Sequence, residues 1–262
     1  MRMGVPPSPS ADAARSRAEP LAAALSRRGT PVEIVVAESY QALGGLLLND
    51  QVDLAWAPPI VCARVEAAGG TTALRAVRHG STTYRAALVC RAGAVVELAN
   101  SPALVAAWVD ENSAAGFLLA RSWLAARHVD ALSAFKRAIF CGSYFAALQA
   151  VAESLADLSS VYCSVEGAPA HSTLDEVDGK LRQRLQVFAH TAETRTDGIV
   201  LPPSGRHRTF EALLGQLEGL HADAEGRRAL RTLLACEELR AEAPRTTSSA
   251  LSSVLTALET RR

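Results

Sequence analysis

The sequence has no excess of charge of either sign and no long apolar run. Lysine and arginine together number 27, and so do aspartate and glutamate, which leaves no overall field to attract nucleic acid or an anionic membrane. A membrane-spanning helix needs about 18 or more consecutive apolar residues, and no such run is present. We therefore expect a folded globular protein with no nucleic-acid partner and no membrane insertion.

Motifs for metals, nucleotides and nucleophilic catalysis are also missing. The six histidines show no HxH or HExxH spacing, and the five cysteines show no CxxC spacing. A GxSxG elbow, a Walker loop and a GxGxxG fingerprint are likewise not found in the sequence. We expect no metal and no cofactor, and the sequence assigns no catalytic residue.

The cysteines and the N-terminal stretch bear on the compartment. The cysteines are scattered, odd in number and mostly set in apolar surroundings, a pattern typical of free thiols in a reducing compartment. The stretch MRMGVPPSPSADAARSRAEPL lacks the apolar core of a secretory signal. We expect a cytoplasmic protein; the alternative is a periplasmic protein whose leader would precede Met1.

What the sequence does have is an alternation of short apolar runs with longer helical patterns. In the first part, each expected strand is followed by an expected helix, which is typical of an α/β fold with a largely parallel sheet. The expected strands cover residues 2–5, 32–37 and 52–57, and the expected helices cover 11–28, 40–49 and 60–68.

A second α/β segment lies between two longer expected strands, at 84–93 and 185–191. Within it we expect strands at 103–109, 135–142 and 157–165 and helices at 117–127, 143–153 and 175–183. Residues 208–262 have helical spacing, and no internal repeat is visible. The pattern predicts two lobes joined by two crossing strands, each lobe a mostly parallel sheet flanked by helices. Lobe 1 would take residues 1–88 and 192–262, and lobe 2 residues 89–191.

Polar and aromatic residues recur where the expected strands end and helices begin. Ligands of open α/β sheets gather at these carboxyl ends, and helix N-termini there favour anions. Each such residue alone is commonly only a cap or a core residue, but their recurrence at equivalent ends, facing one cleft if the lobes close, favours a binding role. The candidate ligand-binding residues are Tyr40, Pro59, Tyr84, Asn112, Ser113, Ala114, Ala115, Gly116, Ser143 and Tyr144.

The order of several stretches resembles the phosphate/phosphite/phosphonate-binding proteins of ABC transporters, a branch of the type 2 periplasmic-binding-protein fold. These stretches are SYQALGGLLLNDQVDLAWAPPIVCAR, GSTTYRAALVCRAGA, ENSAAGFLLARSWL, CGSYFAALQAVAESLADLSSV and EGRRALRTLLACEEL. The resemblance implies a two-lobed protein that closes around a small molecule by hinge motion. It also implies that Tyr40 and Tyr84 match two ligand-contacting tyrosines, and that Ser113 and Gly116 match the first hydroxyl and the glycine of an STSG-like loop.

The sequence departs from that family at three positions. Ala114 and Ala115 stand where the family usually has two more hydroxyls, and Tyr144 stands where a histidine is common after Gly-Ser. Each buried ligand oxygen left without a hydrogen bond costs about 1–3 kcal/mol. We therefore expect the pocket to suit a carboxylate or a less charged ring better than a phosphonate.

The sequence leaves three functional readings open. The leading one is a non-catalytic, intracellular solute-binding or sensor domain, with a possible protein partner for transport or signalling. The alternative is a cytoplasmic enzyme on the same fold that acts on a chorismate-derived carboxylate, as in menaquinone biosynthesis, using Ser113, Tyr144, Glu111 or Asp157. The third is the effector-sensing half of a regulator, which would act through a partner because the chain has no room for a helix-turn-helix.

Overall fold

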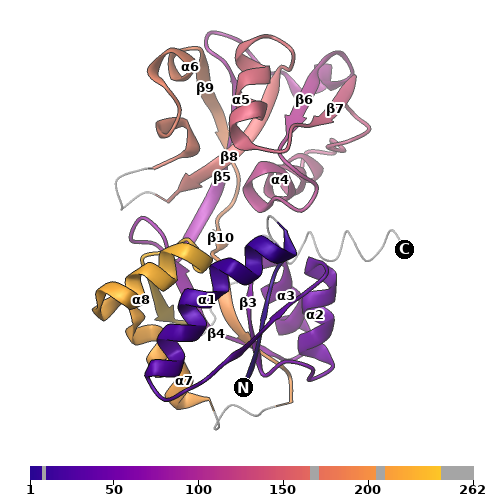
Figure 1. The fold of residues 1–262 in the computed structure, drawn as a ribbon. Helices are drawn as coiled ribbons and strands as arrows, with labels where there is room; N and C mark the ends of the chain where they lie inside the picture. Colours follow the sequence, from indigo (N-terminus) through magenta and orange to yellow (C-terminus); the bar gives the residue numbers. More distant parts are fainter. Residues whose placement is uncertain (8–9, 166–170, 205–209, 243–262) are drawn as a thin grey trace. The chain divides into compact units, whose positions relative to one another are not determined.

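The chain folds into two compact units that are linked twice. The computed structural model describes residues 1–7, 10–165, 171–204 and 210–242. Unit 1 comprises residues 1–82 and 195–242, and unit 2 comprises residues 83–194 (Figure 1). The chain passes into unit 2 at Thr82–Thr83 and returns at Thr194–Arg195. The two-lobed α/β architecture expected from the sequence is thus confirmed, with the second unit inserted into the first.

Unit 1 is built on a six-stranded sheet of order β12-β4-β11-β3-β1-β2. Its strands are β1 (Arg2–Val5), β2 (Glu33–Val36), β3 (Leu54–Ala57), β4 (Thr71–Val77), β11 (Gly198–Leu201) and β12 (Glu238–Ala241). Its helices are α1 (Ala11–Arg27), α2 (Tyr40–Leu48), α3 (Pro59–Ala67), α7 (Glu211–Glu218) and α8 (Ala224–Ala229), which continues into a π-helical turn, Leu230–Leu234.

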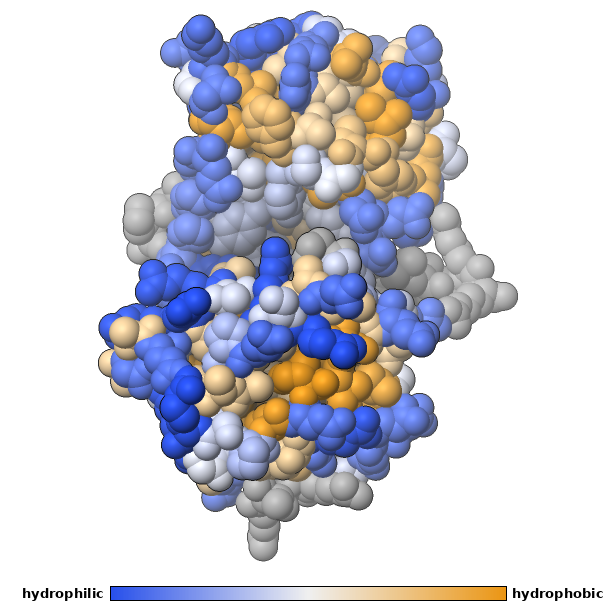
Figure 2. All heavy atoms as spheres, viewed as in Figure 1, coloured by the Kyte–Doolittle hydropathy of each residue, from blue (hydrophilic) through white to orange (hydrophobic). Residues whose placement is uncertain are grey.

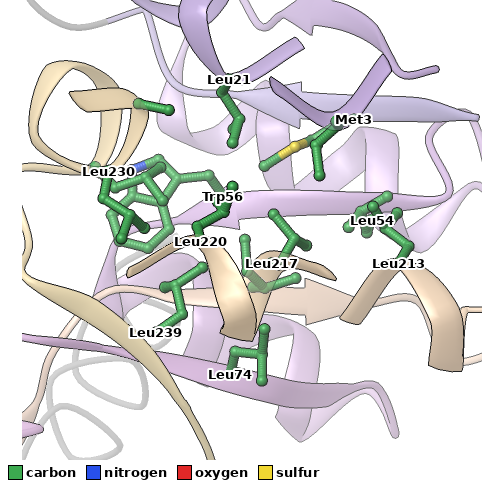
Figure 3. Close-up of a cluster of buried hydrophobic side chains, with 14 of the residues drawn as sticks. Met3, Leu21, Leu54, Trp56, Leu74, Leu213, Leu217, Leu220, Leu230 and Leu239 are labelled. Carbon is green, nitrogen blue, oxygen red and sulfur yellow. The ribbon is translucent and has the colours of Figure 1, made fainter. Parts of the chain in front are cut away.

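The two faces of this sheet are covered by different helices because side chains alternate along each strand. Met3, Leu54 and Trp56 pack with leucines of α1, α7 and the turn after α8, and Figure 3 shows these side chains in one cluster. Ala55 and Ala57 face the other way, toward α2 and α3. The first core joins the two ends of the described chain, which explains why residues after 195 belong to unit 1.

Unit 2 is built on a second sheet, of order β10-β5-β8-β6-β7, with β9 also paired to β5. Its strands are β5 (Thr83–Arg91), β6 (Val105–Trp108), β7 (Arg137–Phe140), β8 (Leu158–Ser164), β9 (Leu185–His190) and, at the return crossing, β10 (Thr194–Arg195). Its helices are α4 (Leu119–Ala125), preceded by a π-helical turn at Ala114–Leu118, α5 (Tyr144–Ala152) and α6 (Gly179–Gln183).

The faces of the second sheet also differ. On one face, α5 packs on a core of small aliphatic side chains that includes Ala107 and Val161. On the other face, the ring of Trp108 lies 5.7 Å from that of Phe117 and 6.2 Å from that of Phe135, measured between ring centroids. The π-helical turn before α4 belongs to this aromatic face.

One connection pattern occurs in both units. In unit 1, β1-α1-β2-α2-β3 forms parallel strands in the order β3-β1-β2, and in unit 2, β6-α4-β7-α5-β8 forms parallel strands in the order β8-β6-β7. The helices α2 and α5, which occupy the same place in this pattern, each have 9 residues. The two units share this order of strands and helices but not their amino-acid sequence, so no internal repeat is visible in the sequence.

The expectation of mostly parallel sheets is wrong, because both sheets are mixed. In unit 1, β11 runs antiparallel to β3 and β4, and β12 runs antiparallel to β4. In unit 2, β5 runs antiparallel to β8 and β9. Of these strands, β4 and β5 flank the first crossing, and β9 and β11 flank the second, where the chain enters the neighbouring sheet without a helix between the strands.

Three local expectations also need correction. β4 was not expected, and β12 lies in a segment expected to be helical; the rest of that segment beyond residue 242 lies outside the described residues. The helix expected from residue 175 begins at Gly179, because the Asp178 side chain accepts hydrogen bonds from the N–H groups of Lys180 and Leu181. Within the described ranges, no helix has the length and apolar character needed to cross a membrane.

Candidate functional site

Four serines begin helical segments where parallel strands end. We call the edge at which the parallel strands of each sheet end its carboxyl edge. Ser10 and Ser39 cap α1 and α2 in unit 1, and Ser113 and Ser143 cap the π-helical turn before α4 and α5 in unit 2. Each Oγ accepts the N–H of the residue three positions on, at 3.3, 3.0, 3.1 and 3.2 Å, respectively. The caps therefore occupy equivalent places in the two units.

These caps are suited to bind anionic or polar groups. A hydroxyl that accepts one hydrogen bond keeps its own proton to donate. The N–H groups of the first turn have no acceptor within the helix, and they lie at the positive end of the helix dipole. Each carboxyl edge thus presents donors, while the caps also stabilise the helices that carry them.

In unit 1, Tyr40 and Pro59 are the first residues of α2 and α3. Tyr40 is half-buried and packs against the apolar cluster beneath α2 and α3, whereas Pro59 is buried. The N-terminus of α3 has no side-chain cap. Behind it, the Cys62 thiol donates to the carbonyl of Ala57 at 3.2 Å, and burial raises the pKa of this thiol.

In unit 2, the loop from Asn112 to Gly116 is held close to the end of β6. Asn112 is exposed, and its N–H donates to Asp110 Oδ1 at 2.8 Å. Ser113 and Ala114 are half-buried, while Ala115 and Gly116 are buried. A Cβ added to Gly116 would lie 2.5 Å from Val109 Cγ2 and 2.6 Å from Ser113 Oγ, so only glycine fits there.

Val109 joins this loop to the loop before α5. Its N–H donates to the carbonyl of Gly116 at 3.2 Å, and its carbonyl accepts the N–H of Gly142 at 2.8 Å. Ser113 and Ser143 are therefore attached to the same short piece of backbone at the carboxyl edge of unit 2. Among the predicted ligand-binding residues, the described contacts thus bring together those of the loop before α4 and those of the loop before α5.

The two tyrosines predicted in unit 2 lie on opposite faces of the sheet. Tyr84 is buried and stacks on Tyr162 of β8, with ring centroids 5.3 Å apart and an interplanar angle of 26°. Tyr144, the first residue of α5, packs against the aliphatic core on the α5 face. Sequence reasoning missed Tyr162, Ser39 and Ser10; the serines repeat the pattern that identified Ser143, a serine just before a helical stretch.

A cavity of about 430 Å³ also lies on unit 2, between α4 and residues 190–192. One wall is Trp123, whose ring has the Arg127 guanidinium 3.7 Å from its centroid. None of the predicted ligand-binding residues lines this cavity. Across the described part of the chain, no group of three or more His, Cys, Asp or Glu side chains is arranged to hold a metal ion.

Comparison with known proteins gives structural neighbours over the whole chain. XAC2383 from Xanthomonas citri, solved with bound chloride, has a TM-score of 0.77 at 16% identity, covering 100% of this chain and 99% of that one. PhnD1 from Prochlorococcus marinus, solved with methylphosphonate, has a TM-score of 0.67 at 15% identity, covering 100% and 98%. At these identities the likeness shows the fold alone.

A third neighbour is a binding-protein component of an ABC phosphonate transporter from Pseudomonas aeruginosa. It has a TM-score of 0.65 at 22% identity and covers 92% of this chain and 81% of that one. No curated protein matches the chain. The sequence model of one family, described as ABC transporter, phosphonate, periplasmic substrate-binding protein, matches residues 3–241. The chain therefore belongs to the phosphonate substrate-binding protein family of ABC transporters.

Proposed function

We propose that the protein binds a small anionic or polar molecule and releases it unchanged, as a solute-binding or sensor protein. The observation that carries this proposal is the set of serine caps Ser10, Ser39, Ser113 and Ser143 at the carboxyl edges. Each cap combines an available hydroxyl proton with the N–H groups of a helix start. These donors suit ligand oxygens, and the family match agrees with a binding role.

The loop in unit 2 supports a carboxylate better than a phosphonate. Ala114 and Ala115 offer no hydroxyl, so the side-chain donors near this loop are Ser113 and Ser143. A carboxylate presents two oxygens, whereas a phosphonate presents three that need partners once buried. The Prochlorococcus neighbour was solved with methylphosphonate and the Xanthomonas neighbour with ATP or chloride, so anions of each kind belong in the test.

The proposal includes a hinge motion of the two units. Its support is the double connection at Thr82–Thr83 and Thr194–Arg195, since two short crossings can rotate without unfolding either sheet. Small-angle X-ray scattering should then show a smaller radius of gyration when the ligand saturates the protein. An unchanged radius of gyration in the presence of a saturating ligand would contradict the hinge motion.

For the compartment, we retain the cytoplasm as a proposal because all five cysteines are free. The family's description names the periplasm, which agrees with the alternative given by the sequence. Fractionation of cells that express the full-length protein with a C-terminal tag distinguishes the two. A transport or signalling partner would be sought by cross-linking in the fraction that holds the protein.

The central experiment is a thermal-shift panel of phosphate, methylphosphonate, ATP, acetate, benzoate and amino acids. A ligand at a hundred times its Kd should add about 2.7 kcal/mol of stability. Ser143→Ala should reduce the ligand-induced shift, whereas Asp223→Ala, which removes the cap of α8, should lower the melting temperature but keep the shift. No shift with any compound would refute the proposal, and a ligand recovered chemically changed would favour the enzyme.

A further inference from the structure

Arg85 is a half-buried arginine that has no partner among the described residues. It is the third residue of β5, directly after Tyr84. Its Nε is buried and has no hydrogen-bond acceptor. Across the described residues, no hydrogen bond or ion pair reaches any part of its guanidinium. Burying a donor of a charged group without an acceptor is more costly than burying a neutral one, so this arrangement needs an explanation.

A buried arginine of unit 1, Arg75, is by contrast fully paired. Arg75 is 4% exposed, and its Nη2 lies 3.0 Å from Glu66 Oε1. Its Nε pairs with Glu242, and its Nη1 donates to the carbonyl of Thr196 at 2.8 Å. A guanidinium that this fold uses for structure is thus matched by two carboxylates. Arg85 is matched by no carboxylate of the described residues, which points away from a purely structural role.

Arg85 also lies at the carboxyl edge of unit 2. It stands opposite Cys163 near the end of β8, in the register of the antiparallel pair β5–β8. Alternation along β5 places Arg85 on the same face as Ala87, which is the face covered by α5 and contacted by Tyr144. The guanidinium is therefore on the same face as the helix that Ser143 caps. A positive side chain and a positive helix end at one edge favour an anion.

We propose that Arg85 is the counter-charge for the ligand, which is accordingly a small oxyanion, a carboxylate or phosphonate, and not a neutral polar molecule. The inference rests on the proposed binding function. A guanidinium presents paired N–H groups that match two oxygens of one oxyanion. In the unliganded protein, the charge stays uncompensated; in the complex, the ligand compensates it. Arg85 therefore lowers the stability of the unliganded protein, and ligand binding removes this loss.

The first test needs no ligand and compares two variants of full-length protein. Arg85→Met keeps an apolar stem of similar length and removes the uncompensated charge, so it should raise the melting temperature by about 2–4 °C. Arg75→Met is the matched control and should lower it, because Glu66 and Glu242 would then be buried without their partner. A fall for Arg85→Met would show that Arg85 is paired in the native protein and would overturn the proposal.

The second test measures charge selectivity by calorimetric titration with benzoate, its neutral analogue benzamide, and methylphosphonate. Wild type should bind at least one of the two anions and not benzamide. Arg85→Met should weaken that anion about tenfold or more, as expected for losing a hydrogen bond to a charged group. An anion affinity unchanged in Arg85→Met would overturn the role of Arg85 while leaving the binding function intact. If wild type responds to no compound in either this titration or the thermal-shift panel, the binding function itself fails.

Glu166 follows β8 in the sequence and lies outside the described residues, and a variant addresses it directly. Glu166→Gln should leave the melting temperature and the anion affinity unchanged. The double variant Glu166→Gln/Arg85→Met completes a thermodynamic cycle. A coupling between the two positions in the unliganded protein would identify Glu166 as the counter-charge and would overturn the proposal.

Discussion

Gly116 offers the sharpest test of the loop that begins at Ser113. In Gly116→Ala, the new Cβ would lie 2.5 Å from Val109 Cγ2 and 2.6 Å from Ser113 Oγ, distances at which one of these groups must move. Val109 directly follows β6, and its carbonyl accepts the N–H of Gly142, so the turn at Ala114–Leu118 should move away from β6. The bond from the Gly116 N–H to Ser113 Oγ, 3.1 Å long, would then be lost.

The expected magnitude follows from these two effects. Overpacking a close contact costs about 1–3 kcal/mol, and losing one hydrogen bond about 0.5–1.5 kcal/mol, which together give a loss of about 1.5–4.5 kcal/mol. Gly45→Ala is the matched control, because Gly45 lies inside α2 and its added Cβ would meet nothing within 4 Å. That variant should gain about 0.5–1 kcal/mol from helix propensity.

Urea unfolding followed by far-ultraviolet circular dichroism measures both changes. The Gly116→Ala loss should appear in the transition of unit 2, and the Gly45→Ala gain in that of unit 1, if the units unfold separately. Gly116→Ala should also abolish the ligand-induced thermal shift, since it displaces Ser113. A loss below about 1 kcal/mol, or a gain like that of the control, would refute the reasoning that this loop is held rigidly against β6.

Three further predictions concern the thiols, one cap and the core. Iodoacetamide at pH 8 should modify half-exposed Cys141 first, and Cys236, whose pKa burial raises to about 12, only after denaturation; early labelling of Cys236 in a mass spectrum would contradict this. The pKa of Asp223 is lowered, mainly because it accepts the Gly226 N–H, so its stabilising effect is present above its unfolded pKa of about 3.9 and is lost as pH falls through the lower folded value. The melting temperatures of wild type and Asp223→Ala should therefore converge at acidic pH, and a gap that stays constant down to pH 2 would be the contrary result. Leu217→Ala should cost about 2–5 kcal/mol in urea unfolding because Leu217 is fully buried, whereas Leu155→Ala, at an exposed position, should change little.

The sequence was sufficient to predict the parallel part of each unit. The runs ending at Val5, Val36 and Ala57 are short and apolar, and each is followed by a helix with a clear start, so strands and helices were found within a few residues. β4 was missed because it carries Arg75, a charged residue in an otherwise buried strand. Arg75 can be buried because it pairs with Glu66 and Glu242. Glu66 lies in α3 and Glu242 is far away in the sequence, so the residues of β4 alone did not indicate a buried strand.

β12 was missed for a related reason. Its residues include Glu238 and Arg240, and its one fully buried side chain is Leu239, so it looked like the continuation of the preceding helical spacing. It is a strand because it pairs with β4, a contact between residues more than 150 positions apart. At the candidate site, the caps Ser113 and Ser143 follow from local pattern, whereas the isolation of Arg85 does not. Whether Arg85 has a partner depends on which side chains the fold brings close to it, and these are distant in the sequence.

The insertion of unit 2 into unit 1 sets an order of events during synthesis. All strands of unit 2 but the last lie between Thr83 and His190, so its sheet is nearly complete once that segment has left the ribosome. Unit 1, although it starts first, has β11 between β3 and β4, and neither strand can acquire this neighbour until residues 198–201 emerge. Domains generally fold as units while the chain lengthens. The middle segment of the polypeptide, residues 83–194, therefore matures before unit 1. The N-terminal strands β3 and β4 lack the neighbour between them until β11 has been synthesised.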